Sequence, residues 1–373
     1  MRYYIIAGEA SGDLHGANLM RGLYAGDPEA EVRFWGGDAM TNVGGTLVQH
    51  YREGAVMGGV EVLAKAGRLL ANLSFCKTDL LAWQPDVVVL IDYPGFNLRM
   101  AEFAKKHGFK VFYYIAPKVW ARGERRIKKI RRYVDSLYII FPFEVEYFRS
   151  RGIEARYFGN PLLDSLQGLS NSTGPVTPKA GVIALLPGSR KAELAFLMPR
   201  FAELEALMRQ DRRFDGYMLA VAGAPSMTPR DYAPYIPEDS TMTVLFGRTG
   251  ELLAEAPAAV ISSGTASLEA ALIGTPQVVC YGFRRITYLL AKMLVKVRYI
   301  SLANLILDRL IFKELIQKDA SPEKMLKELE RLLFDSGCRR RMASDYAELR
   351  QALGGEGASE RIANDMINSL KHK

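Results

Sequence analysis

Short apolar runs that end in a turn of small residues and continue as a helical pattern occur in both halves of the chain. In the first half, the run at residues 2–7 leads into Gly8-Glu9-Ala10-Ser11-Gly12-Asp13, and Val87–Ile91 leads into a Pro-Gly turn. In the second half, the runs at 182–186 and 258–262 behave in the same way. Strands that alternate with helices predict parallel sheets with helices on both faces. The chain is therefore expected to be an α/β protein.

The two halves are expected to be separate domains. Residues 165–181 are rich in Ser, Gly, Thr and Pro and lack periodicity, as is typical of an interdomain linker. A chain of 373 residues is long enough for two or three domains. We expect one Rossmann-like domain over residues 1–165 and another over 166–344. Further strands are expected at 32–37, 110–115, 136–141, 155–158, 217–222, 243–246 and 277–281, and helices at 60–83, 191–210, 249–256, 265–273, 322–350 and 358–370.

The charge balance narrows the class of partner. Net charge is +8, from 49 Lys and Arg against 41 Asp and Glu. This favours nucleotides, phosphorylated substrates or anionic lipid, and no motif supports nucleic acid as a partner. The three cysteines are scattered without disulfide or metal spacing, which suits a reducing cytoplasm. We expect no signal peptide, no spanning helix, no metal and no cofactor, because none of their patterns occurs.

The stretch 259–276 is the first candidate ligand site. A short buried strand turns at Ser263-Gly264-Thr265 and continues as a helix. The unpaired N–H groups and positive dipole end of a helix start suit a phosphate or diphosphate. Glu269, one helical turn further, could accept hydrogen bonds from sugar hydroxyls. The alternative is a plain strand–helix turn with a solvated Glu269. Pro187-Gly188-Ser189-Arg190 forms a second such turn, whose arginine could reach a phosphate.

The first half offers a second group of candidates. The Gly8–Asp13 loop resembles a ligand-binding junction at the carboxyl edge of a parallel sheet, where Glu9 and Asp13 could touch hydroxyls or a catalytic proton. The alternative is a helix-capping role for Ser11 or Asp13. Asp92 ends the clearest buried strand of this half and would face the same edge. Its alternative is to cap the next helix.

Three basic amphipathic stretches remain ambiguous. Residues 60–83 carry a leucine-rich stripe with Lys65, Arg68 and Lys77, a pattern shared by core helices and membrane-surface helices. Residues 125–132 are densely basic, which fits either a solvated face or contact with phosphate groups or anionic lipid. The 284–298 helix repeats the ambiguity.

A resemblance then becomes specific, because ten weak motifs occur in one order over nearly the whole chain. They are Gly8-Glu9-Ala10-Ser11-Gly12-Asp13, Ile91-Asp92 with Pro94 and Phe96-Asn97, Pro117 with Val119-Trp120-Ala121, Phe141-Pro142-Phe143-Glu144, Gly159 with Pro161-Leu162, Leu186-Pro187-Gly188-Ser189-Arg190, Ser263-Gly264-Thr265-Ala266, Gly274-Thr275-Pro276, Ser301-Leu302-Ala303-Asn304 and Glu314-Leu315-Ile316-Gln317. With them the sequence resembles the lipid-A-disaccharide synthases, glycosyltransferases of the GT-B fold. The resemblance implies two Rossmann-like domains facing a cleft, with the C-terminal helix, 345–373, packing back on the first.

The resemblance also implies the reaction. UDP-2,3-diacylglucosamine would transfer its sugar to the 6-hydroxyl of 2,3-diacylglucosamine 1-phosphate (lipid X), giving the lipid A disaccharide 1-phosphate and UDP. Because an α-linked donor gives a β bond, a single inverting displacement is expected, with one general base and groups that hold the leaving diphosphate. Both substrates are lipids, so the resemblance implies a cytoplasmic enzyme attached peripherally to the anionic inner-membrane surface. A homodimer is the other partnership expected.

Site residues follow from the matching motifs. Asp92 is expected to be the general base, with His15 and Asp13 as alternatives. Many members of the family carry a second acidic residue where Gly95 stands, so Asp92 is the sole carboxylate at that strand end. Many also have His where Asn160 stands, which removes one candidate acid or base. The expected substrate-binding residues are Gly8, Glu9, Ser11, Gly12, Asp13 and Asn97 in the acceptor domain, and Gly188, Ser189, Arg190, Ser263, Gly264, Thr265, Glu269, Asn304, Glu314 and Gln317 in the donor domain.

Three other functions fit parts of the pattern. A UDP-N-acetylglucosamine 2-epimerase shares the architecture but acts on one water-soluble substrate and needs no amphipathic basic helices. A murein-type UDP-N-acetylglucosamine transferase uses similar donor turns with a polyprenyl-linked acceptor. A membrane-associated nucleotide sensor would turn over neither substrate.

Overall fold

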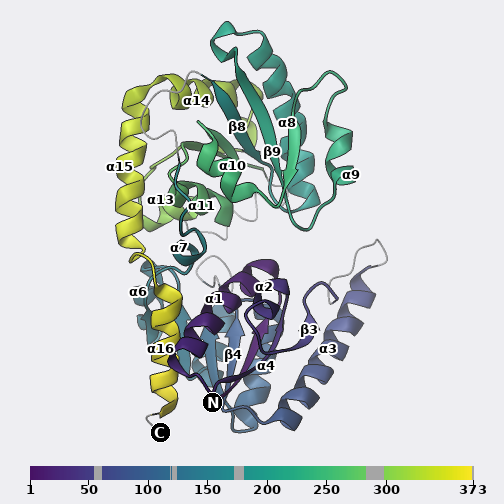
Figure 1. Cartoon of the computed structure of the whole chain (residues 1–373), viewed down its shortest axis with the longest axis vertical. Coiled ribbons are helices and arrows are strands. Elements are labelled where there is room, and N and C mark those ends of the chain that lie inside the picture. The colour runs from purple at the N-terminus through teal and green to yellow at the C-terminus, as the bar shows by residue number, and fades with distance from the viewer. Residues whose placement is uncertain (54–60, 118, 120–123, 172–179, 283–297, 372–373) are drawn as a thin grey trace. The chain divides into compact units, whose positions relative to one another are not determined.

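The computed structural model describes residues 1–53, 61–117, 119, 124–171, 180–282 and 298–371, with backbone alone for 61–66 and 124–125. The chain forms two compact units, Met1–Ser165 with Leu353–Lys373, and Leu166–Ala352 (Figure 1). The return to the first unit begins at Leu353 and not at residue 345. The reason is that one helix runs unbroken from Ser336 to Ala352 within the second unit.

A seven-stranded parallel sheet in the order β3-β2-β1-β4-β5-β6-β7 forms the centre of the first unit. Its strands are β1 Arg2–Ala7, β2 Glu31–Gly36, β3 Thr46–His50, β4 Val87–Ile91, β5 Lys110–Tyr114, β6 Ser136–Ile139 and β7 Ala155–Tyr157. Its helices are α1 Ala10–Gly26, α2 Asp38–Thr41, α3 Glu61–Trp83, α4 Pro94–Lys106, α5 Glu124–Tyr133, α6 Phe143–Arg149, α7 Leu162–Ser165 and the returning α16 Ala358–Lys371.

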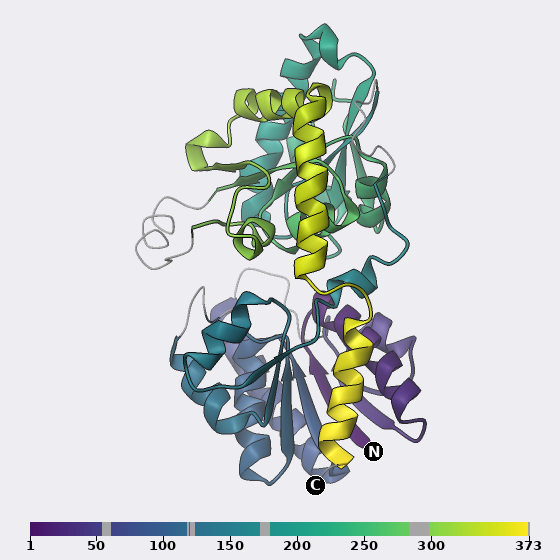
Figure 2. The ribbon, with the colours of Figure 1, turned by 90° about the vertical axis from the view of Figure 1, so that its left-hand side faces the viewer.

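Alternation along the strands divides the side chains between the two faces of this sheet. Tyr4, Ile6, Val88 and Leu90 pack with residues of α3, α4 and α5 in one core. Tyr3, Ile5, Val87 and Val89 pack with α1 and α16 in the other. Figure 2 shows α16, in yellow, lying along the first unit. The returning helix therefore completes the core of the first unit and is not a loose tail.

The second unit repeats the arrangement with a six-stranded parallel sheet in the order β10-β9-β8-β11-β12-β13. Its strands are β8 Gly181–Leu186, β9 Tyr217–Gly223, β10 Thr243–Phe246, β11 Ala259–Ser262, β12 Gln277–Tyr281 and β13 Glu314–Ile316. Its α-helices are α8 Lys191–Arg209, α9 Pro229–Tyr232, α10 Thr249–Glu255, α11 Thr265–Ile273, α13 Leu302–Ile306, α14 Pro322–Phe334 and α15 Ser336–Ala352. The helices α10 and α11 cover one face through Leu252, Leu253, Ala270 and Ile273.

Several sequence expectations change in the structure. The leucine stripe of α3 is divided between core and surface. Leu73 and Leu80 are buried in the first unit. Leu70 and Leu81 of the same helix are exposed. The expected helix at 322–350 is two helices, α14 and α15, separated at Asp335. The 284–298 segment lies outside the described residues except for Arg298. In the described part of the chain, no helix is long and apolar enough to cross a membrane.

Candidate functional site

Both sheets have a point where the strand order reverses along the chain. It lies between β1 and β4 in the first unit and between β8 and β11 in the second. Loops that leave neighbouring strands in opposite directions at such a point open the usual ligand crevice of α/β sheets. Ala7 pairs with Ile91, and Leu186 pairs with Ile261, so the predicted loops emerge side by side at each point.

At the β1/β4 reversal point, an aromatic ring lies so close to the β1–α1 loop that only glycine fits at position 8. A Cβ atom on Gly8 would lie 2.3 Å from Cδ1 of Tyr93, so the Tyr93 ring lies directly against the Gly8 backbone. Burial raises the pKa of Tyr93, and the charge of Glu9 raises it further. Glu9 is the N-cap of α1, yet its side chain makes no capping hydrogen bond, and both Glu9 and Ser11 are exposed. These two side chains can therefore meet a ligand at the loop.

The ends of β4 and β5 carry strained backbone. Asp92, Tyr93 and Ile115 have φ angles of 43°, 46° and 62°, a left-handed region that costs non-glycine residues about 1–3 kcal/mol each. Such strain persists only where the surroundings enforce it and tends to occur at active sites. The strain favours a functional role for Asp92, the predicted base, which is half-buried at this edge.

Three hydrogen bonds hold the Asp92 backbone in place. Its N–H donates to the carbonyl of Tyr114 at 3.1 Å. Its carbonyl accepts from the Tyr113 hydroxyl at 2.6 Å and from Asn97 Nδ2 at 2.8 Å. Asn97 is fully buried and also donates to the carbonyl of Ile91. Asn97 therefore positions the strand end from inside the unit.

Asp13 and His15 lie deeper than the sequence suggested. Asp13 is buried, and its carboxylate accepts from the N–H groups of Gly37, Ala39 and Met40 at 2.7–3.1 Å. It thus caps the start of α2 and not of its own helix. His15 is also buried, which lowers its pKa to about 4 and keeps its imidazole neutral near pH 7. Asp92 is the better placed of the three candidate bases.

At the second point, the β8–α8 turn is tightly organised around Glu193. Gly188 has a φ of 101°, and a Cβ atom there would lie 2.3 Å from Glu193 Oε2. That oxygen accepts from the N–H groups of Ser189 at 3.0 Å and Arg190 at 3.3 Å. Glu193 Oε1 accepts from Arg190 Nη1 at 2.8 Å, while the Arg190 side chain is 75% exposed. An exposed guanidinium at a helix start can bind an anion.

The β11–α11 turn lies next to it. A Cβ atom on Gly188 would come within 2.9 Å of Ser262 Oγ, the last residue of β11. Gly264 and Thr265 are exposed, and nothing lies within 4 Å of where a Cβ atom on Gly264 would be. Burial raises the pKa of Glu269, one turn into α11. The turn is therefore open to a ligand.

Tyr281, at the end of β12, connects the two turns. Burial raises its pKa, the charge of Glu193 raises it further, and Arg190 and a hydrogen bond with Ser263 lower it. These four side chains therefore lie close together at one edge of the second sheet.

Asn304 and Glu314 have structural partners. Asn304 is fully buried, donates to the Phe312 carbonyl and accepts from the Ile311 N–H. Glu314 accepts from the N–H groups of Ile300 and Ser301 and from Asn304 Nδ2. Both side chains therefore hold the 300–316 segment in shape. Gln317 follows β13 with a φ of 58° and lines a cavity of about 200 Å³ with Arg200 and Glu203 of α8.

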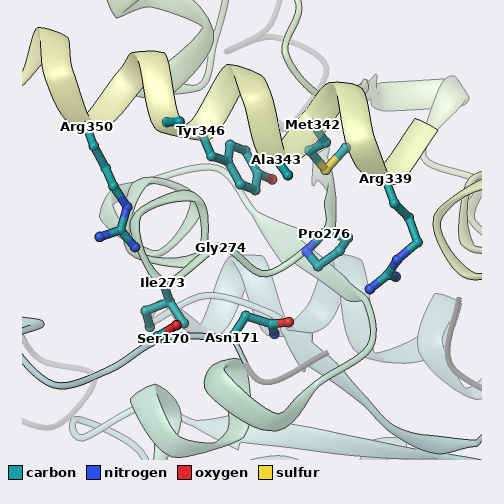
Figure 3. Close-up of a pocket in the computed structure, with 11 residues that line it drawn as sticks. Ser170, Asn171, Ile273, Gly274, Pro276, Arg339, Met342, Ala343, Tyr346 and Arg350 are labelled. Carbon is teal, nitrogen blue, oxygen red and sulfur yellow. The ribbon is translucent and has the colours of Figure 1, made fainter. Parts of the chain in front are cut away.

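A larger cavity of about 240 Å³ lies elsewhere in the second unit (Figure 3). Met342, Tyr346 and Arg350 of α15 line it from one side and Pro276 from the other. Pro276 directly precedes β12, so this cavity is at the amino edge of the sheet, opposite the two turns. It is not part of the candidate site. No group of three or more His, Cys, Asp or Glu among the described residues could hold a metal ion.

The sequence did not predict four residues that contribute to the candidate site: Tyr93, Tyr113, Tyr281 and Glu193. For Glu193 a signal existed, because an acidic residue three positions after a helix N-cap is typical of a capping box. For the tyrosines no local signal exists, because their partners lie on other strands or loops.

Comparison with solved structures shows the fold. The UDP-GlcNAc 2-epimerase of Neisseria meningitidis, solved with UDP-GlcNAc, is similar with a TM-score of 0.69, 11% identity and coverage of 99% of this chain and all of that chain. The calicheamicin glycosyltransferase CalG4 is similar with a TM-score of 0.57, 15% identity and coverage of 99% and 98%. The expected fold class, two parallel-sheet α/β domains of the GT-B type, is confirmed.

Comparison with known sequences shows the family. The family model described as lipid-A-disaccharide synthetase matches residues 3–365. The lipid-A-disaccharide synthase of Trichlorobacter lovleyi is 37% identical, over 99% of this chain and 98% of that protein. That of Geobacter metallireducens is 36% identical, over all of this chain and 98% of that protein. The chain belongs to the lipid-A-disaccharide synthase family.

Proposed function

We propose that this chain is the glycosyltransferase that its family name describes. It transfers 2,3-diacylglucosamine from UDP-2,3-diacylglucosamine to lipid X, and it releases UDP. The match of the family model to residues 3–365 carries this proposal. The epimerase alternative has the same fold, but its solved representatives are only 11–15% identical to this chain and carry no argument about activity.

In the proposed mechanism, the first unit binds the acceptor and Asp92 removes the proton of its 6-hydroxyl. The strained turn at Asp92 and Tyr93 and the exposed Glu9 and Ser11 support this, because they meet at the β1/β4 reversal point. Burial raises the pKa of the Tyr113 hydroxyl, which contacts Asp92, and the charge of Asp92 raises it further; the charge of Arg126, at the start of α5, opposes that shift. Arg126 thus puts a cation near the proposed base, where it attracts a phosphorylated acceptor.

The second unit binds UDP at the two turns around Tyr281. The Ser263–Thr265 turn offers backbone N–H groups to phosphate, Arg190 compensates the diphosphate charge, and Glu269 accepts from ribose hydroxyls. Asn304 and Glu314 support the donor site indirectly, because they hold the 300–316 segment in shape through the contacts described above.

Removing the Arg190 side chain tests this donor site. Arg190→Ala is expected to weaken UDP binding by about 1.5–3 kcal/mol, the scale for a charged hydrogen-bond partner. Titration calorimetry with UDP measures it. The control is Arg248→Ala, which removes a similarly exposed arginine paired with Glu251 at the start of α10. Equal affinity in wild type and Arg190→Ala would remove Arg190 from the site.

Peripheral membrane attachment through the face built by α3, α4 and α5 completes the proposal. On α5, Arg126, Lys128, Arg131 and Arg132 are exposed and make no ion pair with any described residue. Leu70 of α3 is 64% exposed on the same face of the sheet. Exposed cations on one helix of a face and an exposed apolar side chain on another helix of that face suit an anionic lipid surface. The homodimer expected from the sequence stays a prediction, which sedimentation of the purified chain can test.

Mass spectrometry of reaction products tests the reaction itself. Purified protein with both lipid substrates should form the disaccharide 1-phosphate and UDP in equal amounts. A murein-type transferase would use UDP-N-acetylglucosamine with a polyprenyl-linked acceptor, and an epimerase would convert UDP-N-acetylglucosamine without any acceptor. Either of those products, or none from the lipid pair, would contradict the proposal.

A further inference from the structure

One carboxylate occupies three of the groups that the proposed donor site would offer to a diphosphate. Glu193 accepts from the N–H of Ser189 at 3.0 Å, the N–H of Arg190 at 3.3 Å and the Arg190 guanidinium at 2.8 Å. Its side chain is only 10% exposed. A negative charge thus already lies where the negative charge of the leaving group would develop.

The backbone is shaped to admit this carboxylate. A Cβ atom at position 188 would lie 2.3 Å from Glu193 Oε2, so only glycine leaves room for the contact. Gly188 also has a φ of 101°, in the region that favours glycine. The Glu193 contact and the glycine of this turn therefore depend on each other.

Two negative groups cannot share these donors without a large electrostatic cost. A diphosphate that takes the Arg190 guanidinium must compete with Glu193 for it. We propose that Glu193 is an internal substitute for the diphosphate: it holds the turn and Arg190 in place in the empty site, is displaced when the donor binds, and returns to expel UDP. This inference rests on the proposed donor site and deepens it by assigning a residue that controls product release.

Titration calorimetry with UDP on Glu193→Gln tests the inference. The amide keeps the size and one acceptor oxygen but loses the charge. We expect UDP to bind about three- to tenfold more tightly, the range for removing a partly exposed ion pair and weakening a charged hydrogen bond. Product inhibition by UDP should strengthen by the same factor, whereas the KM for the acceptor should not change.

The second unit offers a matched control. Arg248 is the N-cap of α10, and Glu251, three residues later, accepts from its Nε at 2.6 Å. Glu251→Gln removes the same kind of pair from a helix start outside the proposed site. It should leave UDP affinity unchanged.

The outcomes separate the possible roles of Glu193. A purely structural capping role predicts a lower melting temperature for Glu193→Gln with equal or weaker UDP binding, and that result would overturn the inference. If Glu193→Gln unfolds, Glu193→Asp serves instead, because its shorter side chain should loosen the same contacts and also tighten UDP binding. Unchanged UDP affinity of Glu193→Asp would overturn the inference too.

If wild type binds UDP and Arg190→Ala does not, but both Glu193 variants bind like wild type, this inference fails while the proposed function stands. Absence of UDP binding by wild type would refute the donor site itself.

Discussion

Two side chains hold the backbone of Asp92, and this makes the strand end rigid. Tyr113 and Asn97 both donate to the Asp92 carbonyl, at 2.6 and 2.8 Å. A general base must lie within about 3 Å of the proton that it removes, so a small displacement of its backbone reduces turnover. We infer that Tyr113 is a positioning residue for Asp92.

Removing one hydroxyl tests this positioning role. Tyr113→Phe should lower the free energy of unfolding by about 1 kcal/mol and turnover roughly tenfold, without changing UDP affinity. Tyr138→Phe is the control, because its hydroxyl donates to Asp365 of α16 at 2.8 Å, within the same unit. The control should lose similar stability but keep its turnover. Equal turnover in both variants would show that the Tyr113 hydrogen bond only stabilises the fold.

Residue roles were the part of the site that sequence alone could not decide. Asp13 follows a ligand-type loop, but its partners are N–H groups 24 to 27 residues away, at the start of α2. Asn304 and Glu314 belong to family motifs, yet they form hydrogen bonds with each other and with backbone groups of residues 300–312. A carboxylate that binds a ligand and one that caps a distant helix look alike until the tertiary contacts are known.

At the scale of elements, the sequence predicted most strands because buried parallel strands are continuous apolar runs. It missed β3 and β13, which lie at the edges of their sheets. Edge strands are covered less, and residues 46–50 and 314–316 accordingly lack a purely apolar run. The α3 helix was ambiguous for the opposite reason, since its leucines serve both the core and the surface.

At this scale we predict that the exposed charges of helix α5 contribute to membrane binding. Reversing three of its exposed charges, by Lys128→Glu, Arg131→Glu and Arg132→Glu, should weaken binding to phosphatidylglycerol vesicles by about 100-fold or more. The reason is that each basic residue near an anionic surface contributes about 1 kcal/mol. Vesicle co-sedimentation at low and high salt measures this. The control reverses Arg212, Lys327 and Arg340, three exposed charges of the second unit, with the same change in net charge. If both triple variants bind equally well, the α5 face does not contact the membrane.

At the scale of the whole molecule, the chain crosses between its units twice, after Ser165 and after Ala352. The returning segment is held on the first unit by Asp164, which accepts from the N–H groups of Gly357 and Ser359, and by Arg156, which donates to Asp365. His15 of α1 lies near Asp164: burial lowers the pKa of His15 to about 4, and the charge of Asp164 opposes that shift.

This buried histidine predicts how stability depends on pH. Its folded pKa of about 4 lies below the unfolded value of 6.5, so the unfolded chain binds the extra proton. His15 therefore leaves stability intact above pH 6.5 and reduces it as pH falls toward 4, by up to about 3 kcal/mol. Urea unfolding at pH 7 and pH 5 measures the loss for wild type. His15→Gln should lose clearly less over this interval, and an identical loss would show that other groups cause it.

In the proposed mechanism, the first unit supplies the base and the second unit holds UDP. The most direct test is the turnover of Asp92→Asn, measured together with its UDP affinity. The amide keeps the shape of the side chain but removes its basicity, so turnover should fall by about 10²–10⁴-fold, the scale for a general base, while UDP binds as in wild type. Turnover above about a tenth of the wild-type value would contradict the assignment of Asp92 as the base.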